Sequence, residues 1–572
     1  GKARGRATGQ SQAMLTACIA SVGAAYLPSQ RPAPGAPLCG SARGRAAVRC
    51  AEAGTLTQSA VDDWLGSAVA ARGSVASGLL DEVRSEATDV VLAARRPGRK
   101  QEAWRRTDLS LLYGATLGAP SGRVGELVAG YVEEEEAAAA AARPRLVFVD
   151  GVYSADLSDT SSLGGGAYAG PLEQVPPEVR EAVLESLREI PEREADPRTE
   201  LGCHTFAALN QAALSDVACV YVPSGVAVDT LRLILLSTPS YPDSGAEAGA
   251  SPQLAASHPN LSLWLGDGAS LSLLQQYAGR GAYFCNGLSR LRLGENASLT
   301  HAYLQEQSDG AVHVDSVLAT LAAGARYDAN LVQSGGRLSR VNLAVRLEGR
   351  HSHASLNGIA LGSESQLLDL HSAVRHVSPD CNSDPQRNSR PSAPAHPSHA
   401  LHVGLQAPPS RSSATPSPAA RGTPPPPRCS RLRALSPPTT RPVPRRSQVV
   451  FRGAVQVPHG SDNTTANQLC RSLLLSDSAR VDISPNLEIL TDDVVCTHGA
   501  TVADLDDEMV FYLQARGLGR AEARVLLLEG WARSLMGEVP SEAATRRVAA
   551  KAAGLAREGA AREVRKQAMS SI

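Results

Sequence analysis

The sequence predicts a mainly β protein, with a right-handed parallel β-helix (solenoid) core flanked by N-terminal and C-terminal α-helical segments. Two observations predict this class. A strand–turn unit recurs at nearly constant spacing through the middle of the chain, and helical periodicity appears on both sides of that repeat. The repeat is the stronger signal, because stacked units bury a face that no single unit could bury alone.

The repeated unit is a short turn that follows a leucine, contains a small residue and leads into an alternating strand. The copies start at Leu265, Leu293, Leu321 and Leu347, which are 28, 28 and 26 residues apart, and then at Leu361 and Leu475. A β-sandwich with regularly spaced strands is the alternative, but a sandwich has no reason to repeat one turn sequence at one spacing. We therefore assign the β-helix core to residues 201–503.

Helical periodicity defines a segment on each side of this core. In residues 51–200 apolar side chains recur at three- and four-residue steps, which predicts an N-terminal helical domain. Residues 504–572 are assigned to a C-terminal helical domain. There, acidic residues precede a first helix, Gly517 is suited to end it, and a second helix with one apolar side follows at 520–531.

Composition excludes several classes of protein. The 572 residues carry a formal net charge of −1, which argues against a nucleic-acid-binding protein. No run of eighteen apolar residues occurs, so we expect a soluble protein without a membrane-spanning helix. The ten cysteines are scattered without a C-x-x-C pair, as in a reducing compartment. A P-loop motif is absent, so we expect no nucleotide bound in that way. Core positions are expected for Cys203, Cys219, Cys285 and Cys470.

Residues 1–50 have the composition of an organelle transit peptide. They contain several arginines among Ala, Ser, Gly and Pro, and neither Asp nor Glu. Met14 would be a natural start, which leaves open whether residues 1–13 are upstream sequence or an artefact. The scarcity of aromatic residues and the abundance of Ala and Ser favour import into a plastid. A disordered basic tail is the alternative.

Residues 384–446 differ in composition from the rest of the chain. Pro, Ser and Arg dominate this segment, and Lys and Glu are absent from it. Such a composition cannot form a packed core, so we predict a disordered insertion that interrupts the β-helix. The sequence leaves open whether the insertion is genuine or an artefact of the gene model.

Cys496 and His498 lie two residues apart in a segment rich in β-branched residues that ends at Gly499. A strand would place both side chains on one face, where a thiolate and an imidazole could share a soft metal. For the spacing alone, a small buried cysteine and a hydrogen-bonded turn histidine are the commoner interpretation. Another group of histidines falls on alternating strands without an Asp or Glu at a fixed offset, so we expect structural roles for them. They are His351, His353, His371 and His376.

Several motifs surround this pair. They are Leu473-Leu474-Leu475-Ser476-Asp477, Pro485-x-Leu487-Glu488-Ile489, Asp493-Val494-x-Cys496-x-His498-Gly499-Ala500-Thr501-Val502 and Phe511-Tyr512-Leu513-x-x-Arg516-Gly517. Together they resemble the C-terminal signature of SufD, a scaffold subunit of the Suf iron–sulfur cluster assembly system, of plastid type. Near the N-terminus, Glu102-x-Trp104-Arg105-x-Thr107 resembles a segment of SufB and SufD proteins, with Trp104 as a packing anchor. The resemblance covers about 102–536 apart from the insertion, and it favours SufD over SufB.

This resemblance implies a non-catalytic scaffold subunit, in the plastid stroma, of a SufBCD-type complex. Nascent iron–sulfur clusters would form at the interface with a SufB-like subunit, and a SufC-like ABC ATPase would hydrolyse ATP. His498 in the first place, and Cys496 in the second, would contribute to a transient iron or iron–sulfur site shared with the SufB-like partner. The C-terminal helices would dock the ATPase through Phe511, Tyr512, Leu527, Leu528 and Trp531.

Other functions stay open on the sequence alone. The chain could be a purely structural subunit that supports its partners without ligating iron. The apolar C-terminal helices could also pack against each other or the core rather than against an ATPase. A β-helix enzyme acting on polysaccharides is the remote alternative, but it needs an acidic cluster on one sheet face, where the repeat strands carry Ser, Thr and Leu.

Overall fold

We describe a computed structural model of the chain. Placed residues are 63–71, 78–122, 143–191, 200–239, 253–363, 365–383, 399–405, 447–475, 479–503, 505–536, 539 and 541–570. The predicted transit peptide lies outside these residues. No helix among those placed combines the length and the apolar character needed to cross a membrane.

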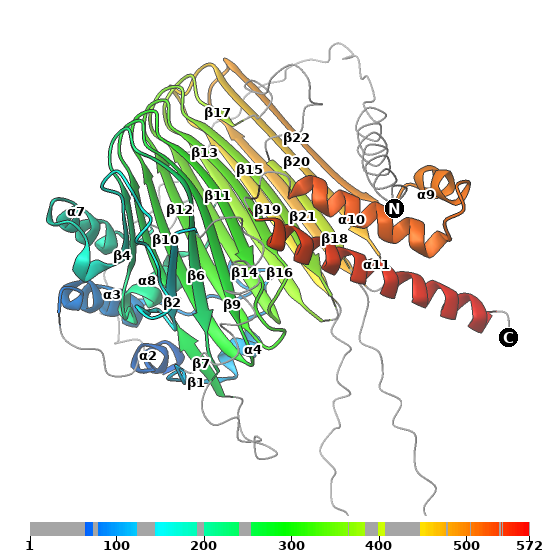
Figure 1. The fold of residues 1–572 in the computed structure, drawn as a ribbon, viewed down its shortest axis with the longest axis horizontal. Helices are drawn as coiled ribbons and strands as arrows, with labels where there is room; N and C mark the ends of the chain where they lie inside the picture. Colours follow the sequence, from blue (N-terminus) through cyan, green and yellow to red (C-terminus); the bar gives the residue numbers. More distant parts are fainter. Residues whose placement is uncertain are drawn as a thin grey trace, which may run out of the picture.

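Two long sheets face each other and form the solenoid (Figure 1). Sheet A contains β1 (Thr116–Gly118), β4 (Tyr168–Pro171), β5 (Ala218–Val222), β7 (Gln253–Ser257), β8 (Asn260–Leu265), β10 (Tyr283–Leu293), β12 (Val312–Leu321), β14 (Leu338–Leu347), β16 (Leu367–His376), β19 (Gln448–Val457) and β21 (Arg480–Ile489). Sheet B contains β2 (Arg145–Val149), β3 (Val152–Tyr153), β6 (Ala227–Ser237), β9 (Ser270–Gly279), β11 (Ser298–Gln305), β13 (Arg326–Gln333), β15 (His353–Gly362), β17 (Asn382–Ser383), β18 (His399–Leu405), β20 (Thr464–Leu474) and β22 (Val494–Ala503). From β8 onward the chain alternates between the sheets, except that β17 and β18 follow each other in sheet B, and neighbouring strands are parallel. The prediction of a parallel β-solenoid is confirmed.

The repeated leucines mark the same position on successive turns. Leu265 pairs in register with Leu293, Leu293 with Leu321, and Leu321 with Leu347. In the first three of these turns the residue three positions after the leucine adopts a positive φ. These residues are Gly268, Asn296 and Gly324. Glycine and asparagine tolerate this left-handed conformation, which explains why one turn sequence recurs.

The copies at Leu361 and Leu475 differ from the other four. The first four turns lead from sheet A to sheet B, whereas Leu361 and Leu475 lie where the chain passes from sheet B back to sheet A. These two copies therefore belong to the other edge of the solenoid, and the single repeat predicted from sequence consists of two kinds of turn.

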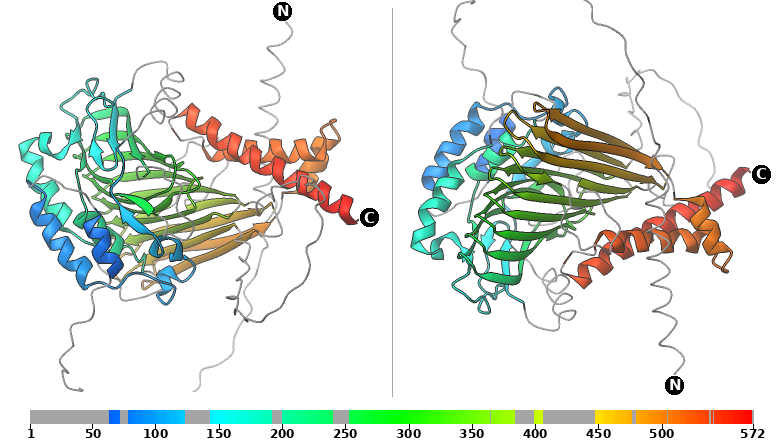
Figure 2. Two further views of the ribbon diagram at one scale, coloured as in Figure 1. Left: turned by 90° about the horizontal axis from the view of Figure 1, so that it is seen from below. Right: turned by 90° about the horizontal axis from the view of Figure 1, so that it is seen from above.

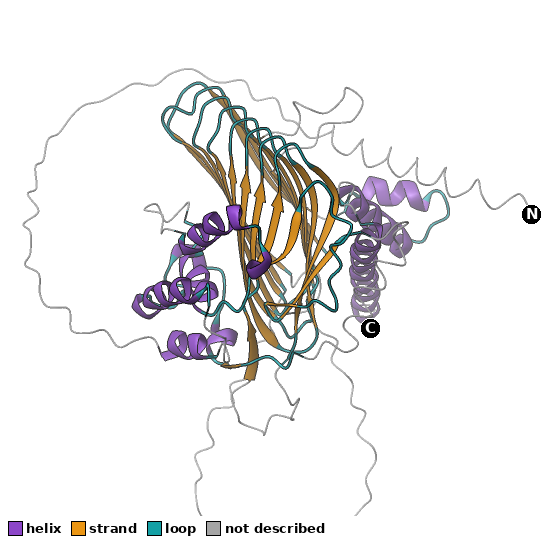
Figure 3. Cartoon of the chain, turned by 60° about the vertical axis from the view of Figure 1, so that its left-hand side comes forward, coloured by secondary structure: helices purple, strands orange, loops and turns teal. Residues whose placement is uncertain are grey.

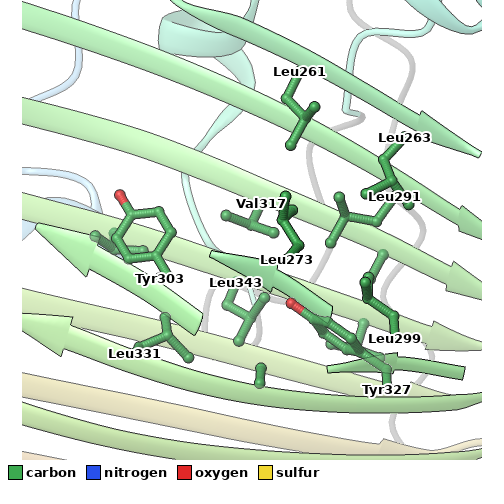
Figure 4. Close-up of a cluster of buried hydrophobic side chains, with 14 of the residues drawn as sticks. Leu261, Leu263, Leu273, Leu291, Leu299, Tyr303, Val317, Tyr327, Leu331 and Leu343 are labelled. Atoms are coloured by element: carbon green, nitrogen blue, oxygen red, sulfur yellow. The ribbon is translucent and has the colours of Figure 1, made fainter. Parts of the chain in front are cut away.

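The core lies between the sheets, where inward side chains stack from turn to turn. Leu271, Leu299 and Tyr327 are consecutive register partners within it, and Figure 4 shows part of this cluster. Polar groups are also buried there. The hydroxyl of Tyr303 donates to Asp315 at 2.7 Å and lies 2.8 Å from the ring Nε2 of His313. Cys203, Cys219, Cys285 and Cys470 are buried, as expected from the sequence.

Helices pack on the outer faces of the two sheets, in separate groups at the two sides of the solenoid (Figures 2 and 3). The N-terminal group consists of α2 (Asp63–Ala70), α3 (Asp81–Ala93), α4 (Ser110–Tyr113), α7 (Pro177–Arg188) and α8 (His204–Ala212). Side chains of α2, α3 and α8 share an apolar cluster with Phe284, Val312 and Leu338 of sheet A. Within the segment 51–200, β2 and β4 also join the two sheets, so this segment is not helical throughout.

The C-terminal group consists of α9 (Asp507–Gln514), α10 (Arg520–Leu535) and α11 (Glu542–Ser570). Leu528 of α10 and Val548 of α11 share an apolar cluster with Leu304 and Ile359 of sheet B. The Asp506 side chain caps α9 by accepting from the backbone of Glu508. The buried faces of α10 and α11 therefore pack against the chain's own sheet B, which is the self-packing alternative stated above.

A buried arginine fastens the N-terminal segment to sheet A. Arg340 donates to the backbone oxygens of Ala103 and Leu201, forms an ion pair with Asp369 at 3.0 Å, and lies 4.0 Å from the ring centroid of Trp104. The cation–π contact and the hydrogen bonds satisfy a charge that would be costly to bury alone. Trp104 is thus the packing anchor that the sequence predicted.

Within the predicted insertion at 384–446 the structure describes residues 399–405, and only for these does it correct the prediction of disorder; the rest of the segment lies outside the described residues. Within this segment β18 pairs in parallel with β15 on one side and with β20 on the other. Together β17 and β18 occupy one strand position of sheet B, so the insertion supplies part of a turn instead of only interrupting the solenoid. Composition pointed to disorder because Pro, Ser and Arg outweigh the short alternating stretch at 399–405.

We predict that stability falls as the medium becomes acidic. Burial lowers the pKa of four histidines, to about 4 for two of them and to about 3 for the others. They are His258, His371, His301 and His313. Each is neutral when folded and takes up a proton near pH 6.5 when unfolded, so its stabilisation is complete above pH 6.5 and decreases as pH falls toward 4.

Three carboxyl groups oppose this trend. Burial raises the pKa of Asp150 to about 6 and also raises the pKa of Asp216 and of Asp315, so all three gain stability on acidification. Four histidines outweigh them, and we expect a net loss of about 2 to 4 kcal/mol between pH 7.5 and pH 5.5. Urea unfolding followed by circular dichroism at the two pH values measures it. An equal or higher midpoint at pH 5.5 would contradict the prediction.

Candidate metal site at the last turn of the solenoid

The last turn of the solenoid consists of β21 and β22, which carry the predicted metal ligands. Each pairs with one described strand only, β21 with β19 and β22 with β20. Their outer edges therefore present backbone donors and acceptors that no described strand pairs. Such edges are templates for pairing with another chain.

Cys496 and His498 lie on one face of β22, as their spacing predicted, and this is the interior face of the solenoid. Val494 and Cys496 pack against Val455 and Ala466 of the preceding turn. Because side chains alternate along a strand, His498 shares the face of Cys496. His498 is exposed to solvent and Cys496 is half-buried. The structure thus places an imidazole and a thiol side by side at the uncovered end of the core.

The register partner of His498 is Gln468, which sequence reasoning missed. Gln468 is buried, and its side-chain Oε1 has no hydrogen-bond partner in the described structure. A buried acceptor without a donor is unfavourable, so an N–H of the His498 ring or a group brought by a partner would stabilise it. No sequence signal identifies Gln468, because only the register of β20 and β22 places it beside His498.

The two candidate ligands differ in their chemistry. Burial raises the pKa of the Cys496 thiol, although a hydrogen bond with the backbone of Ala466 acts in the opposite direction. The thiol is therefore protonated at neutral pH, and the thiolate needed for ligation forms less readily. The exposed His498 ring is the better ligand of the two in this chain.

This chain offers an incomplete ligand set. Among the described residues no three His, Cys, Asp or Glu side chains lie close enough together to hold a metal ion. An iron–sulfur cluster usually takes four protein ligands. Cys496 and His498 could supply two of them, and the others would have to come from a second chain.

Apolar side chains are exposed around the same turn. Val495 is 63 % exposed and Val502 53 %, and Ile489 and Leu490 at the end of β21 are also exposed. Exposed apolar groups beside unpaired strand edges are typical of surfaces that bind another protein. The sequence does not reveal this, because the same residues would be buried if a further turn followed.

The predicted ATPase-docking residues fall into two groups. Leu527 and Leu528 are both buried within the chain. Leu527 packs against α9, and Leu528 packs in the apolar cluster with sheet B. Trp531 is half-buried beside the cluster that contains Leu528. Leu527 and Leu528 therefore do not present a free docking surface, in contrast to the expectation. Phe511 on α9 is 70 % exposed, and the guanidinium of Arg516 lies 3.4 Å from the ring centroid of its half-buried neighbour Tyr512.

Of the four histidines predicted to be structural, His353, His371 and His376 are buried, whereas His351 is exposed and lies on a turn rather than on a strand. His371 is buried, and its ring hydrogen-bonds with Arg340 and lies 3.0 Å from Asp369. His376 hydrogen-bonds with Ser383 at 3.1 Å. Their packing within the solenoid fits the structural role expected for them.

The fold and the site define a class of protein: a parallel β-solenoid whose last turn carries strand edges that no described strand pairs and two candidate metal ligands. Two family models match the chain. One is described as SUF system FeS cluster assembly, SufBD core domain, and matches residues 247–389 and 443–531. The other, the SufBD protein N-terminal region, matches residues 69–232. The chain belongs to the SufBD family of the SUF iron–sulfur cluster assembly system.

Similar proteins include plant, cyanobacterial and bacterial members of this family. The chain is 26 % identical over 467 residues to Protein ABCI7, chloroplastic, of Arabidopsis thaliana, which covers 81 % of this chain and 83 % of that protein. It is 26 % identical over 480 residues to the SufBD family protein slr0076 of Synechocystis, and this match covers 81 % of this chain and 88 % of that protein. It is 23 % identical over 460 residues to the iron–sulfur cluster assembly protein SufD of Escherichia coli, and this match covers 80 % of this chain and 88 % of that protein.

Proposed function

We propose that this chain is a SufD-type scaffold subunit that assembles nascent iron–sulfur clusters at an interface with a SufB-like subunit. The observation that carries the proposal is the last turn, where Cys496 and His498 lie beside unpaired strand edges and exposed apolar side chains. The cluster, or iron on its way to one, is cargo held transiently. The chain itself performs no catalysis.

The interface forms through the last turn of both sheets. A second solenoid that aligns with β21 and β22 would pair their outer edges and cover Val495 and Val502, as sheet edges do when they are extended by another chain. It would also bring its own side chains to the interior face that carries His498. This arrangement completes a ligand set that the present chain lacks.

ATP hydrolysis belongs to a SufC-like ABC ATPase that docks on the C-terminal helices. Phe511 is the exposed anchor of this contact, with Tyr512 beside it. The buried Leu527 and Leu528 hold α10 in place and support the docking surface from beneath. The proposed location is the plastid stroma, in line with the chloroplastic relative in Arabidopsis thaliana and the composition of residues 1–50.

A purely structural subunit that ligates no iron is the second candidate. It is favoured by the raised pKa of Cys496 and by the small number of ligands in this chain. Loss of cluster formation on removal of His498 separates the two, because a structural subunit would tolerate that change. We do not propose a polysaccharide-active enzyme, because both family models that match the chain describe SufBD proteins.

Co-expression with the SufB-like and SufC-like subunits tests the proposal. An affinity tag on this chain should recover both partners in one complex. Val502→Arg, at the exposed end of the last turn, should reduce recovery of the SufB-like subunit, because a cation would enter an apolar contact. Val377→Arg is the matched control, since Val377 is also exposed but follows β16. Recovery of this chain alone, or equal recovery with both variants, would contradict the interface.

A further inference from the structure

The outer edge of β21 is interrupted by a proline. At the start of β21, Arg480 donates its backbone N–H to Ser447 at 2.9 Å, and just past its end Leu490 donates to Val457 at 2.8 Å. Between these two bonds the register of β21 with β19 has no shift. Successive residues of a strand direct their backbone groups to opposite sides, so every even-numbered residue from 480 to 490 bonds toward β19. The odd-numbered residues therefore face the edge that no described strand pairs.

The odd-numbered residues of β21 are Val481, Ile483, Pro485, Leu487 and Ile489. All except the proline present a backbone N–H at the outer edge. Proline has no N–H, so position 485 presents only a carbonyl there. Its place costs β21 no bond to β19, which explains how a proline can lie inside this strand. Pro485 divides the outer edge into two short rows of donors, one on each side of it.

A strand that paired along the whole of β21 would meet this gap. One of its backbone carbonyls would lie opposite Pro485 without a donor, and a buried carbonyl without a donor is costly. The nearest donors on the two sides, Ile483 and Leu487, are about 13 Å apart along the strand. A strand that pairs with only one row avoids the gap. Pro485 therefore limits the register in which another chain can extend sheet A.

The C-terminal row of donors lies beside the candidate metal ligands. Leu487 packs against the same apolar cluster as Val494 and Cys496 of β22. At the end of the row, Ile489 is 40 % exposed and the adjacent Leu490 is 47 % exposed. A strand added here would cover these two apolar side chains and would lie close to Cys496.

The N-terminal row is less suited to pairing. Val481 and Ile483 are half-buried and pack against the main core of the solenoid. On the outer face between them, Asp482 forms an ion pair with Arg480 at 2.9 Å, and Arg106 lies 3.6 Å from the same carboxylate. A strand added at this end would cover charged groups, which is unfavourable, and would find no strongly exposed apolar side chain.

We propose that a strand of the SufB-like subunit pairs with residues 487–489 of β21 and does not extend past Pro485. The proposal rests on the function proposed above and adds where the partner contacts sheet A. It also gives a role to the motif Pro485-x-Leu487-Glu488-Ile489, which the proposed function does not use. Leu487 and Ile489 donate to carbonyls of the partner strand, and that strand carries apolar side chains toward Ile489 and Leu490.

Hydrogen–deuterium exchange with residue resolution tests this pairing on the unmodified chain. Exchange of backbone N–H groups is compared between a dilute solution of the isolated chain and its complex with the SufB-like and SufC-like subunits. We expect Leu487 and Ile489 to exchange at least about tenfold more slowly in the complex, and Val481 and Ile483 to exchange at unchanged rates. Equal protection on both sides of Pro485, or protection of the N-terminal row alone, would overturn the proposal.

Proline substitutions test the same contact by binding. Ile489→Pro and Ile483→Pro each remove one N–H from the outer edge and none from the ladder with β19. Ile489→Pro should reduce recovery of the SufB-like subunit on the tagged chain about tenfold, whereas Ile483→Pro should not. Ile489→Val keeps the N–H and an apolar side chain and should bind normally. Circular dichroism shows whether each variant is folded. Equal recovery with Ile489→Pro and Ile489→Val would overturn the proposal.

The results also separate this pairing from the proposed function. A complex that forms without protection of any N–H on β21 or β22 would contradict the interface and this pairing together. Protection on the N-terminal side of Pro485, in a complex that binds iron and sulfide, would contradict only the pairing. Protection of Leu487 and Ile489 in a concentrated solution of the isolated chain would assign the edge to a second copy of this chain and overturn its assignment to the SufB-like subunit.

Discussion

Replacing His498 with alanine is expected to abolish cluster formation by the assembled complex while the chain stays folded. The side chain is exposed on β22, so its removal should change the free energy of unfolding by no more than about 0.5 kcal/mol. The site has few ligands in this chain, so loss of the His498 imidazole leaves the cluster without a protein ligand that it needs. Iron and acid-labile sulfide in the purified complex measure the effect. Cys496→Ser should have a smaller effect, because the raised pKa of that thiol makes it the weaker ligand.

The matched control for this change is His459→Ala. His459 is another exposed histidine, on the turn between β19 and β20, and it lies outside the proposed site. We expect a normal cluster yield and normal ATPase activity from this control. A normal yield from His498→Ala, in a complex with all subunits present, would reduce this chain to the structural subunit considered above.

Replacing Phe511 with aspartate is expected to weaken ATPase binding by about 30-fold or more, the effect of losing one aromatic anchor worth about 2 kcal/mol. Phe511 is 70 % exposed, so the variant should fold normally. Binding of the SufC-like subunit to the immobilised chain measures the loss. Leu92→Asp, at an exposed apolar position of α3, is the control and should bind normally. Unchanged affinity of Phe511→Asp would show that the ATPase docks elsewhere.

Leu527→Asp would be a misleading test of the same contact. Leu527 packs against Val510 and Ala523 between α9 and α10, so a buried charge there would unfold the helix pair. Loss of ATPase binding would then follow from either cause. The helical periodicity of 520–531 correctly predicted an apolar face, but periodicity cannot show whether that face meets the chain's own sheet or a partner.

The solenoid was predictable because its signal is repeated. The leucines that mark each turn are direct register partners, and the left-handed positions of the turns hold Gly268, Asn296 and Gly324. Each turn sequence therefore encodes the same local geometry. The strand β18 was not predictable from composition, since its stability depends on pairing with β15 and β20 on both sides.

The candidate site was predictable only in part. The two-residue spacing places Cys496 and His498 on one face of a strand, and the structure agrees. The buried Gln468 beside His498 and the exposed Val495 depend on which strands meet and where the sheets end. Contacts between distant parts of the chain determine these features.

The central claim is tested most directly by anaerobic reconstitution. Bound iron and acid-labile sulfide are measured in the isolated chain and in its complex with the SufB-like and SufC-like subunits. Two candidate ligands on an uncovered turn cannot hold a cluster alone, and a partner across the edges of β21 and β22 would supply the others. We therefore predict stoichiometric iron and sulfide in the complex and only traces in the isolated chain. Equal loading of the isolated chain, or none in a fully assembled complex, would contradict a site shared across this interface.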